Sequence, residues 1–249
     1  MYNTLKRKLA AGKTTVGAWL TIPSMDVAEA LSTLPLAWFV FDLEHAPLTE
    51  QTAQQLMQSI RSEHTTPLVR VAWNDHVLIK RALDIGSHGI VVPMVNTRAD
   101  AERAVQACRY PPHGARGCGP RRPWVCDPDY LATADEELIV IVQIETEEAV
   151  RNLDEILTVE GVGAFFVGAV DLSFSMGFRG AMDDSGFQKA IDTIHEAGRR
   201  HGVASGIWLG AGKQLQDRVR EGWQMIAIGM DIQLLVAGAK QAIAVADLQ

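Results

Sequence analysis

The chain has 249 residues, of which 47% are hydrophobic, and its 30 Asp and Glu residues against 23 Lys and Arg residues give a formal net charge of −7. This length and apolar content suffice for one large core, and no Gly/Ser-rich, charged or low-complexity linker divides the chain, so we expect a single domain over residues 1–249. The negative charge disfavours a nucleic-acid partner. No apolar window approaches the roughly 18 residues of a membrane span. The three cysteines form no CxxC pair and the N-terminus does not resemble a signal peptide, which indicates a cytoplasmic protein with reduced thiols.

Eight apolar runs rich in Val and Ile recur along the chain. They do not alternate with polar residues, which is typical of parallel strands buried on both faces. We therefore predict strands over 16–22, 37–43, 67–73, 89–95, 138–145, 164–170, 203–210 and 225–230.

Helical patterns, with apolar residues at three- and four-residue spacing, lie between these runs. Asn74-Asp75 and Thr146 precede two of them, as helix caps do. Eight strands alternating with about eight helices in this length predict an α/β fold, a (β/α)8 TIM barrel. The rival doubly wound sheet usually carries GxGxxG after its first strand, and none occurs here. The clearest helical patterns cover 53–60, 78–83, 149–157 and 187–194.

One long segment, residues 111–127, interrupts the alternation of strands and helices. Loops of this length inside a compact domain are usually functional or disordered, and the Gly, Pro and Arg content of this one is compatible with both.

Polar side chains collect at the C-terminal ends of the predicted strands, where TIM barrels carry their sites. A buried charge is costly unless it is paired or coordinated, so a ligand shared by these residues would explain them together. The residues are Trp19, Asp42, Glu44, His45, Arg70, Gln143, Glu145, Asp171 and Asp231.

Glu145 and Asp171 end adjacent predicted strands. Either one alone is more often a salt-bridge partner or a helix cap, but the pair predicts a site of hard oxygen ligands. Mg²⁺ or Mn²⁺ suits such a site, with Co²⁺ as a third option, and we expect no organic cofactor. Two protein ligands would leave coordination positions for substrate and water, as Lewis-acid catalysis requires.

Arg70 lies inside an apolar run, where a guanidinium needs a partner. It is either an internal ion pair with Asp42 or a clamp for an oxyanion, since Arg stays charged and donates in a fixed fork. His45 is either a loop histidine or a general base. No lysine lies among the strand-end residues, because Lys80 and Lys213 fall on expected helices, and this disfavours a Schiff base.

Three tryptophans are expected to line a pocket, and the remaining Trp and Met residues to pack in the core. The three are Trp19, Trp124 and Trp208.

Seven motifs in the correct order make the chain resemble the HpcH/HpaI aldolase family, which comprises class II, metal-dependent pyruvate aldolases. The resemblance runs from about residue 5 to the C-terminal helix. The motifs are FDLEHAP, PLVRV, IKRALDIG, GIVVPMV, RYPPHGARG, VQIET and VGAVDLS.

The resemblance implies roles for individual residues. Glu145 and Asp171 match the metal ligands, Gln143 matches a substrate-binding glutamine, and the backbone of Val170 and Asp171 matches the segment that holds the oxoacid carboxylate. His45 matches the proton acceptor, with Arg70 as transition-state stabiliser. Asp84 matches an aspartate that raises the basicity of the histidine, and Trp19 is expected at the substrate, with Asp42 and Glu44 in support.

The resemblance also implies a homohexamer built from dimers with an exchanged C-terminal helix, in addition to an N-terminal helix before the barrel. Because Asp84 ends a helix on the far side of a simple barrel, it is expected to reach the site from another subunit or by a path that strand counting misses. The chain departs from the family at Gly168-Ala169, where the family usually has Gly-Pro, and in the shorter loop after GARG. That loop is expected to shape the aldehyde pocket or a subunit contact.

The expected reaction is the reversible cleavage of a 4-hydroxy-2-oxoacid into pyruvate, or a related 2-oxoacid such as hydroxypyruvate, and an aldehyde, by way of a metal-stabilised enolate. A lyase that decarboxylates oxaloacetate or acts on an acyl-CoA thioester is the nearest alternative. A non-catalytic barrel that binds an oxoacid is a more remote one.

Overall fold

The computed structural model describes residues 1–209 and 215–245, and within them eight parallel strands form a closed barrel in chain order. The fold predicted from the alternation of strands and helices is confirmed, and every predicted strand overlaps an observed one. The strands are β1 (Thr15–Leu20), β2 (Trp38–Asp42), β3 (Thr66–Arg70), β4 (Gly89–Val92), β5 (Ile139–Ile144), β6 (Val162–Val167), β7 (Ala204–Trp208) and β8 (Met225–Met230).

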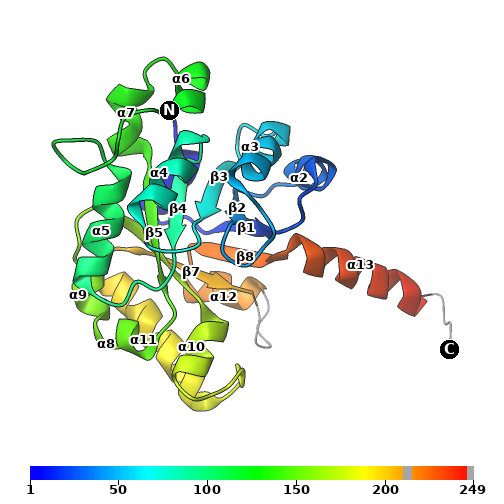
Figure 1. Cartoon of the computed structure of the whole chain (residues 1–249). Coiled ribbons are helices and arrows are strands. Elements are labelled where there is room, and N and C mark those ends of the chain that lie inside the picture. The colour runs from blue at the N-terminus through cyan, green and yellow to red at the C-terminus, as the bar shows by residue number, and fades with distance from the viewer. Residues whose placement is uncertain (210–214, 246–249) are drawn as a thin grey trace.

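Helices follow the strands and cover the outside of the barrel (Figure 1). The helices of the described residues are α1 (Thr4–Ala10), α2 (Met25–Ser32), α3 (Glu50–Ser59), α4 (His76–Asp84), α5 (Arg98–Cys108), α6 (Arg121–Cys126), α7 (Tyr130–Glu137), α8 (Glu147–Arg151), α9 (Leu153–Leu157), α10 (Ala169–Ser175), α11 (Ser185–His201), α12 (Leu215–Glu221) and α13 (Asp231–Val245).

The caps predicted from sequence are present. The Asp75 carboxylate accepts the N–H groups of Val77 and Leu78 at 2.8 and 3.1 Å, and the Thr146 hydroxyl accepts the Ala149 N–H at 3.0 Å. The single helix expected over 149–157 is wrong, because the chain forms α8 and α9 with a break at Asn152.

The strands are buried on both faces, which explains their unbroken apolar runs. One cluster of side chains, including Trp38 and Phe166, fills the inside of the barrel. A second, including Phe41 and Ile79, lies between strands and helices. Gly17 makes room for the inner cluster, since a Cβ there would lie 2.1 Å from the Trp38 ring.

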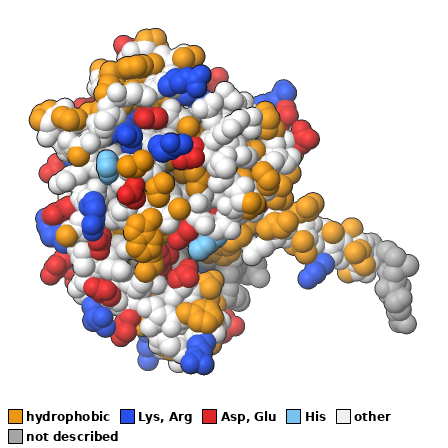
Figure 2. All heavy atoms as spheres, in the orientation of Figure 1, with side chains coloured by type: hydrophobic (Ala, Val, Ile, Leu, Met, Phe, Trp, Pro, Cys, Tyr) orange, Lys and Arg blue, Asp and Glu red, His pale blue; other side chains and the backbone are white. Residues whose placement is uncertain are grey.

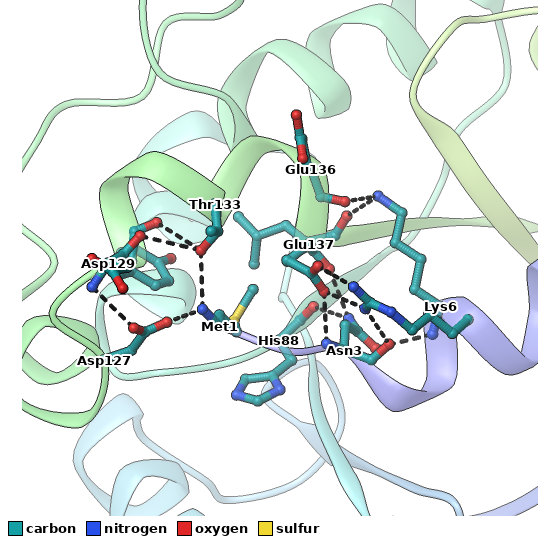
Figure 3. A network of polar contacts seen from close by, with 12 residues as sticks. Met1, Asn3, Lys6, His88, Asp127, Asp129, Thr133, Glu136 and Glu137 are labelled. Atoms are coloured by element: carbon teal, nitrogen blue, oxygen red, sulfur yellow. Dashed lines mark hydrogen bonds and ion pairs between the residues drawn. The ribbon is translucent and has the colours of Figure 1, made fainter.

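The N-terminal segment is tied to the N-terminal end of the barrel (Figure 3). The Asn3 side chain donates to the carbonyl oxygens of His88 and Glu137, both at 2.9 Å, and the Asn3 N–H donates to the Glu137 carboxylate at 2.7 Å. The amino group of Met1 contacts Asp127. Helix α1 thereby packs Leu5 and the rest of its apolar face against the inner cluster, as expected of an N-terminal helix.

Helix α13 leaves the barrel after β8 and extends away from it (Figure 1). Apolar side chains stand exposed along this helix (Figure 2); they include Ile232, Leu235, Val236 and Ile243. Among the described residues, no helix combines the length and the apolar character that crossing a bilayer would take.

Candidate active site

A cavity of about 470 Å³ opens at the C-terminal ends of the strands, and its size is typical of ligand pockets. The closed parallel barrel brings these ends together although they are far apart in sequence. The cavity lining contains seven of the residues that the sequence predicted for the site or its pocket: Trp19, His45, Arg70, Gln143, Val170, Asp171 and Trp208.

Arg70 and Asp42 form a buried ion pair across β2 and β3, whose register places them opposite each other. The Nε and Nη2 atoms of Arg70 donate to the two Asp42 oxygens at 2.9 and 2.7 Å. Asp42 Oδ1 also accepts the N–H groups of Glu44 and His45 at 3.0 and 3.3 Å, which shapes the turn after β2. The internal ion pair predicted for Arg70 is therefore confirmed.

The remaining face of the Arg70 guanidinium points to the cavity. Its Nη1 atom lies 3.1 Å from Glu44 Oε2, but that buried oxygen has no hydrogen-bond partner among the described residues. Asp42 uses two of the five guanidinium N–H donors, and Nη1 forms an ion pair with Glu44 without a hydrogen bond, so the Nη1 N–H groups can still donate to an anionic oxygen.

Glu44 sits between Arg70 and the exposed His45, whose Nε2 atom is 3.7 Å from Glu44 Oε1. Burial raises the pKa of Glu44 to about 7; the Arg70 charge opposes this shift, and the Asp42 and Asp171 charges add to it. Asp171, at the start of α10, therefore lies close enough to Glu44, in the turn after β2, for its charge to affect the Glu44 pKa.

Glu145, directly after β5, is 4% exposed and fixed through both oxygens. Oε1 accepts the Met94 N–H at 2.6 Å, and Oε2 accepts Gln143 Nε2 at 3.0 Å. Burial raises the pKa of Glu145 to about 7, against the Met94 hydrogen bond and with help from the Glu44 and Asp171 charges. Gly168 packs against this carboxylate, since a Cβ there would lie 2.6 Å from Oε2.

Asp171 and Val170 lie in the first turn of α10, immediately after β6, where Gly168 is the N-cap. The first backbone bond of that helix runs from the Leu172 N–H to the Gly168 oxygen at 2.9 Å. The N–H groups of Val170 and Asp171 precede it, at the positive end of the helix. Ala169 occupies the first helical position.

The charges on this side of the cavity are mainly negative. Burial is the main cause of the raised pKa values of Glu44 and Glu145; the Asp171 charge adds to both, and the Glu44 charge adds to that of Glu145. The nearby Arg70 is already paired with Asp42. Within residues 1–209 and 215–245, no group of three His, Cys, Asp or Glu side chains is placed to hold a cation. A cation at Glu145 and Asp171 would therefore have two carboxylate ligands from the protein.

Asp84 is far from this cavity in its own chain. It ends α4, at the N-terminal end of the barrel, and accepts a bond from Arg116 Nη2 at 2.8 Å. The segment 111–127 lies at the same end and contains α6 (Figure 1). The expectation that this segment shapes the pocket is therefore wrong within one chain, because a segment that follows a helix returns to the N-terminal ends of the strands.

Two other residues singled out from the sequence, Trp124 and Asp231, are not among the described residues that line the cavity. Trp124 does not line it but is 46% exposed on α6, which corrects the prediction for that residue. Asp231 accepts the N–H groups of Thr21 and Ile22 and so fastens the turn after β1. Lys80 is on α4 as expected, and Lys213 lies outside the described residues.

Some residues that line the cavity or hold its side chains were not predicted. The Met94 N–H donates to Glu145, and the Met94 backbone is left-handed with φ of 55°, a conformation that the local sequence does not predict. Gln188 and Arg218 come from the outer helices α11 and α12. Their polar atoms at the cavity were not found because the apolar periodicity of a helix says nothing about a polar residue facing inward.

The chain matches the family model described as HpcH/HpaI aldolase/citrate lyase over residues 15–237. A 4-hydroxy-2-oxo-heptane-1,7-dioate aldolase from Escherichia coli is 42% identical over 245 residues, covering 96% of this chain and 93% of the relative. A HpcH/HpaI aldolase/citrate lyase family protein from Burkholderia cenocepacia J2315 superposes with a TM-score of 0.92 at 31% identity, covering 99% of this chain and 100% of that one. The citrate synthase SbnG superposes with a TM-score of 0.87 at 28% identity, covering 97% and 96%. The chain therefore belongs to the HpcH/HpaI aldolase/citrate lyase family, which confirms the family and the aldolase class predicted from its motifs.

Proposed function

We propose that this chain reversibly cleaves a 4-hydroxy-2-oxoacid into pyruvate, or a related 2-oxoacid such as hydroxypyruvate, and an aldehyde. The observation that carries the proposal is that Arg70 and Asp171 line one cavity, and that Asp171 and Glu44 lie close enough to the buried Glu145 for their charges to add to the rise in its pKa. When an oxoacid forms its enolate, negative charge passes from C3 to the C2 oxygen. A cation on the acidic side and a guanidinium beside it can stabilise that charge.

A divalent cation fits the acidic side of the cavity, with Mg²⁺ or Mn²⁺ as first choice and Co²⁺ as a third. Glu145 and Asp171 would hold it, because hard cations prefer carboxylate oxygens. Burial is the main cause of the raised pKa of Glu145, but the like charges of Glu44 and Asp171 add to it, and a cation would compensate them. When bound, such a cation polarises the carbonyl oxygens of its ligand as a Lewis acid.

The oxoacid carboxylate is assigned to the first turn of α10, where the N–H groups of Val170 and Asp171 precede the first helical bond. Gln143 borders the same place. Its Nε2 holds Glu145, and its buried Oε1 has no partner among the described residues. Trp19 covers the Arg70 guanidinium at 4.4 Å and excludes water from that side.

In the cleavage direction, His45 accepts the proton of the C4 hydroxyl while the bond between C3 and C4 breaks and the aldehyde leaves. The electron pair of that bond passes to C3 and C2, and negative charge appears on the C2 oxygen. Arg70 stabilises that charge through Nη1, because Asp42 holds the guanidinium in place. C3 then takes up a proton to complete the 2-oxoacid, and addition runs through the same steps in reverse.

Asp84 is proposed to act on His45 of a neighbouring copy, since its own chain places it at the other end of the barrel. We propose that the protein is a homo-oligomer, a hexamer in its full state, in which α13 is exchanged between copies. The exposed apolar side chains of α13 support this, because burial against another copy would remove them from water (Figure 2). Light scattering tests it: Leu235→Glu should lower the assembled mass, and a monomeric wild type would contradict it.

Deuterium exchange at C3 of pyruvate, followed by NMR, tests the enolisation step without any aldehyde. We expect exchange with Mg²⁺ or Mn²⁺, its loss in excess EDTA, and recovery when the metal is restored. Glu145→Gln should lose exchange, whereas Glu148→Gln, the same substitution on the exposed face of α8, should keep it. Undiminished exchange in EDTA or in Glu145→Gln would contradict the proposal.

A further inference from the structure

The cavity extends beyond its catalytic end into a part that the reaction scheme leaves unassigned. Six apolar side chains from β6, β7, α11 and the loop before it form its walls, and we call this part the acceptor compartment. It is lined by Phe166, Met182, Phe187, Ile191, Ile207 and Trp208. A three-carbon oxoacid beside Arg70 fills only part of about 470 Å³, so this compartment is available to the second substrate.

Trp19 connects the acceptor compartment with the catalytic end. Its ring covers the Arg70 guanidinium at 4.4 Å, meets Phe166 edge-on at 5.7 Å and lies 6.1 Å from the Trp208 ring. An aldehyde whose carbonyl carbon reaches C3 of an oxoacid beside Arg70 therefore has its remaining atoms along these rings. Trp208, at the end of β7, is half-buried and forms the far wall.

The charge of the compartment is compensated. Apart from His45, Arg70 and Asp171 at the catalytic end, the charged side chain among its described lining residues is Arg218. Arg218 is 2% exposed, its Nη1 donates to Glu221 Oε2 at 3.0 Å, and it lies over the Trp223 ring. A carboxylate entering the compartment would have to compete with Glu221 for this guanidinium.

Two buried polar atoms of the compartment lack a hydrogen-bond partner among the described residues, and they differ in kind. Arg218 Nε is a donor, whereas Gln188 Oε1 is an acceptor, because Gln188 Nε2 donates to the Met182 carbonyl at 2.5 Å. Both atoms are buried away from the cavity surface, so neither offers an entering carboxylate an open hydrogen-bond partner.

We propose that the acceptor compartment receives uncharged aldehydes with an apolar body in preference to semialdehydes that carry a carboxylate, and that Trp208 determines this preference. The inference rests on the proposed aldolase reaction and names the class of its second substrate. Beyond the catalytic end, the described lining residues offer these apolar walls no unpaired cation, so burying a carboxylate there is costly, whereas an alkyl or aryl body gains from leaving water.

Two aldehydes of similar size separate the possibilities in the wild-type enzyme. Succinic semialdehyde ends in a carboxylate, and 4-methylpentanal ends in an isopropyl group of similar shape. With pyruvate and Mg²⁺, we expect kcat/KM for 4-methylpentanal to be at least about tenfold higher, in line with hydrophobic pocket discrimination. Equal or higher kcat/KM for succinic semialdehyde would overturn the inference, while the absence of deuterium exchange at pyruvate C3 would instead overturn the proposed function.

Substitutions at position 208 test the wall itself. Trp208→Ala should raise KM for 4-methylpentanal about tenfold or more and should change KM for pyruvate far less, while Trp208→Phe restores most of the loss. Trp73→Ala is the matched control, because Trp73 is 55% exposed after β3 and is not among the cavity lining residues. If Trp208→Ala raises KM equally for both aldehydes, Trp208 does not select between them. If Trp208→Ala fails to fold, the Trp208→Phe variant and the comparison of the two aldehydes in the wild-type enzyme still test the inference.

Discussion

Replacing Arg70 by methionine removes a charge from a buried pair while keeping most of the side-chain length. Arg70 is 6% and Asp42 0% exposed, and two hydrogen bonds of 2.9 and 2.7 Å join them. Arg70→Met leaves the Asp42 carboxylate buried without its cation. Breaking a buried pair in this way commonly costs about 3–5 kcal/mol, which is the loss in free energy of unfolding that we expect.

A second substitution separates the lost charge from lost packing. Asp42→Asn removes the negative charge but keeps the Oδ1 acceptor for the N–H groups of Glu44 and His45. The double variant, Arg70→Met with Asp42→Asn, should therefore be more stable than Arg70→Met alone, with a coupling free energy of about 2–3 kcal/mol. Guanidinium chloride unfolding of the four proteins measures it, and a coupling near zero would refute the reasoning.

Catalysis should respond differently from stability. Both Arg70→Met and the double variant should lose deuterium exchange at pyruvate C3 by about 10²–10³-fold, the usual effect of removing a preorganised donor. The double variant regains stability but has no guanidinium for the C2 oxygen. If it also regained exchange, the role of Arg70 would be to support the turn after β2 and not to stabilise the enolate.

Three further results are expected. Gly168→Ala should raise the Mg²⁺ concentration needed for half-maximal exchange by about tenfold or more, because its Cβ would meet the Glu145 carboxylate at 2.6 Å. Ala169→Pro should raise the free energy of unfolding by about 0.4–1 kcal/mol, since proline suits the first position of α10 and no helical bond is lost; a loss of stability would contradict this. Burial, with the Arg122 and N-terminal charges, lowers the pKa of His88 in the folded chain from 6.5 to about 4. As the pH drops through this interval, the unfolded chain binds the proton first, so the free energy of unfolding should fall. His88→Asn should flatten urea-measured stability in that interval, and an unchanged slope would refute the assignment.

The barrel could be predicted from sequence because each strand is buried on both faces. Burial on both faces produces an unbroken apolar run, and eight such runs separated by helical patterns leave few architectures. The break between α8 and α9 could not be predicted in the same way. The apolar periodicity continues across Asn152 and so does not indicate a break there. The Asn152 side chain donates to the Asn96 carbonyl at 2.8 Å, and this contact with another loop cannot be read from the local pattern.

The position of a residue along its strand determines at which end of the barrel it lies, and cavity residues could be predicted as far as this rule applies. Gln143 and Arg70 were placed at the cavity in this way, and the structure has them among its lining residues. Trp124 was misplaced because it was judged by residue type and not by position. It follows a helix, and the chain after a helix is at the N-terminal ends of the strands, where Trp124 lies on α6.

The order of charges along the cavity indicates how a substrate lies in it. At one end Arg70 is neutralised by Asp42, so its effect on a bound oxoacid depends on charge that develops during the reaction and not on charge already present. Glu145 and Asp171 beside it would repel an anionic oxoacid, and only a cation between them and the substrate reverses that repulsion. Beyond Trp19 the walls are apolar, and the cation among their described residues, Arg218, is paired with Glu221. With the proposed cation bound, the anionic head of a substrate would lie between that cation and the first turn of α10, and its uncharged tail would be directed toward Trp208.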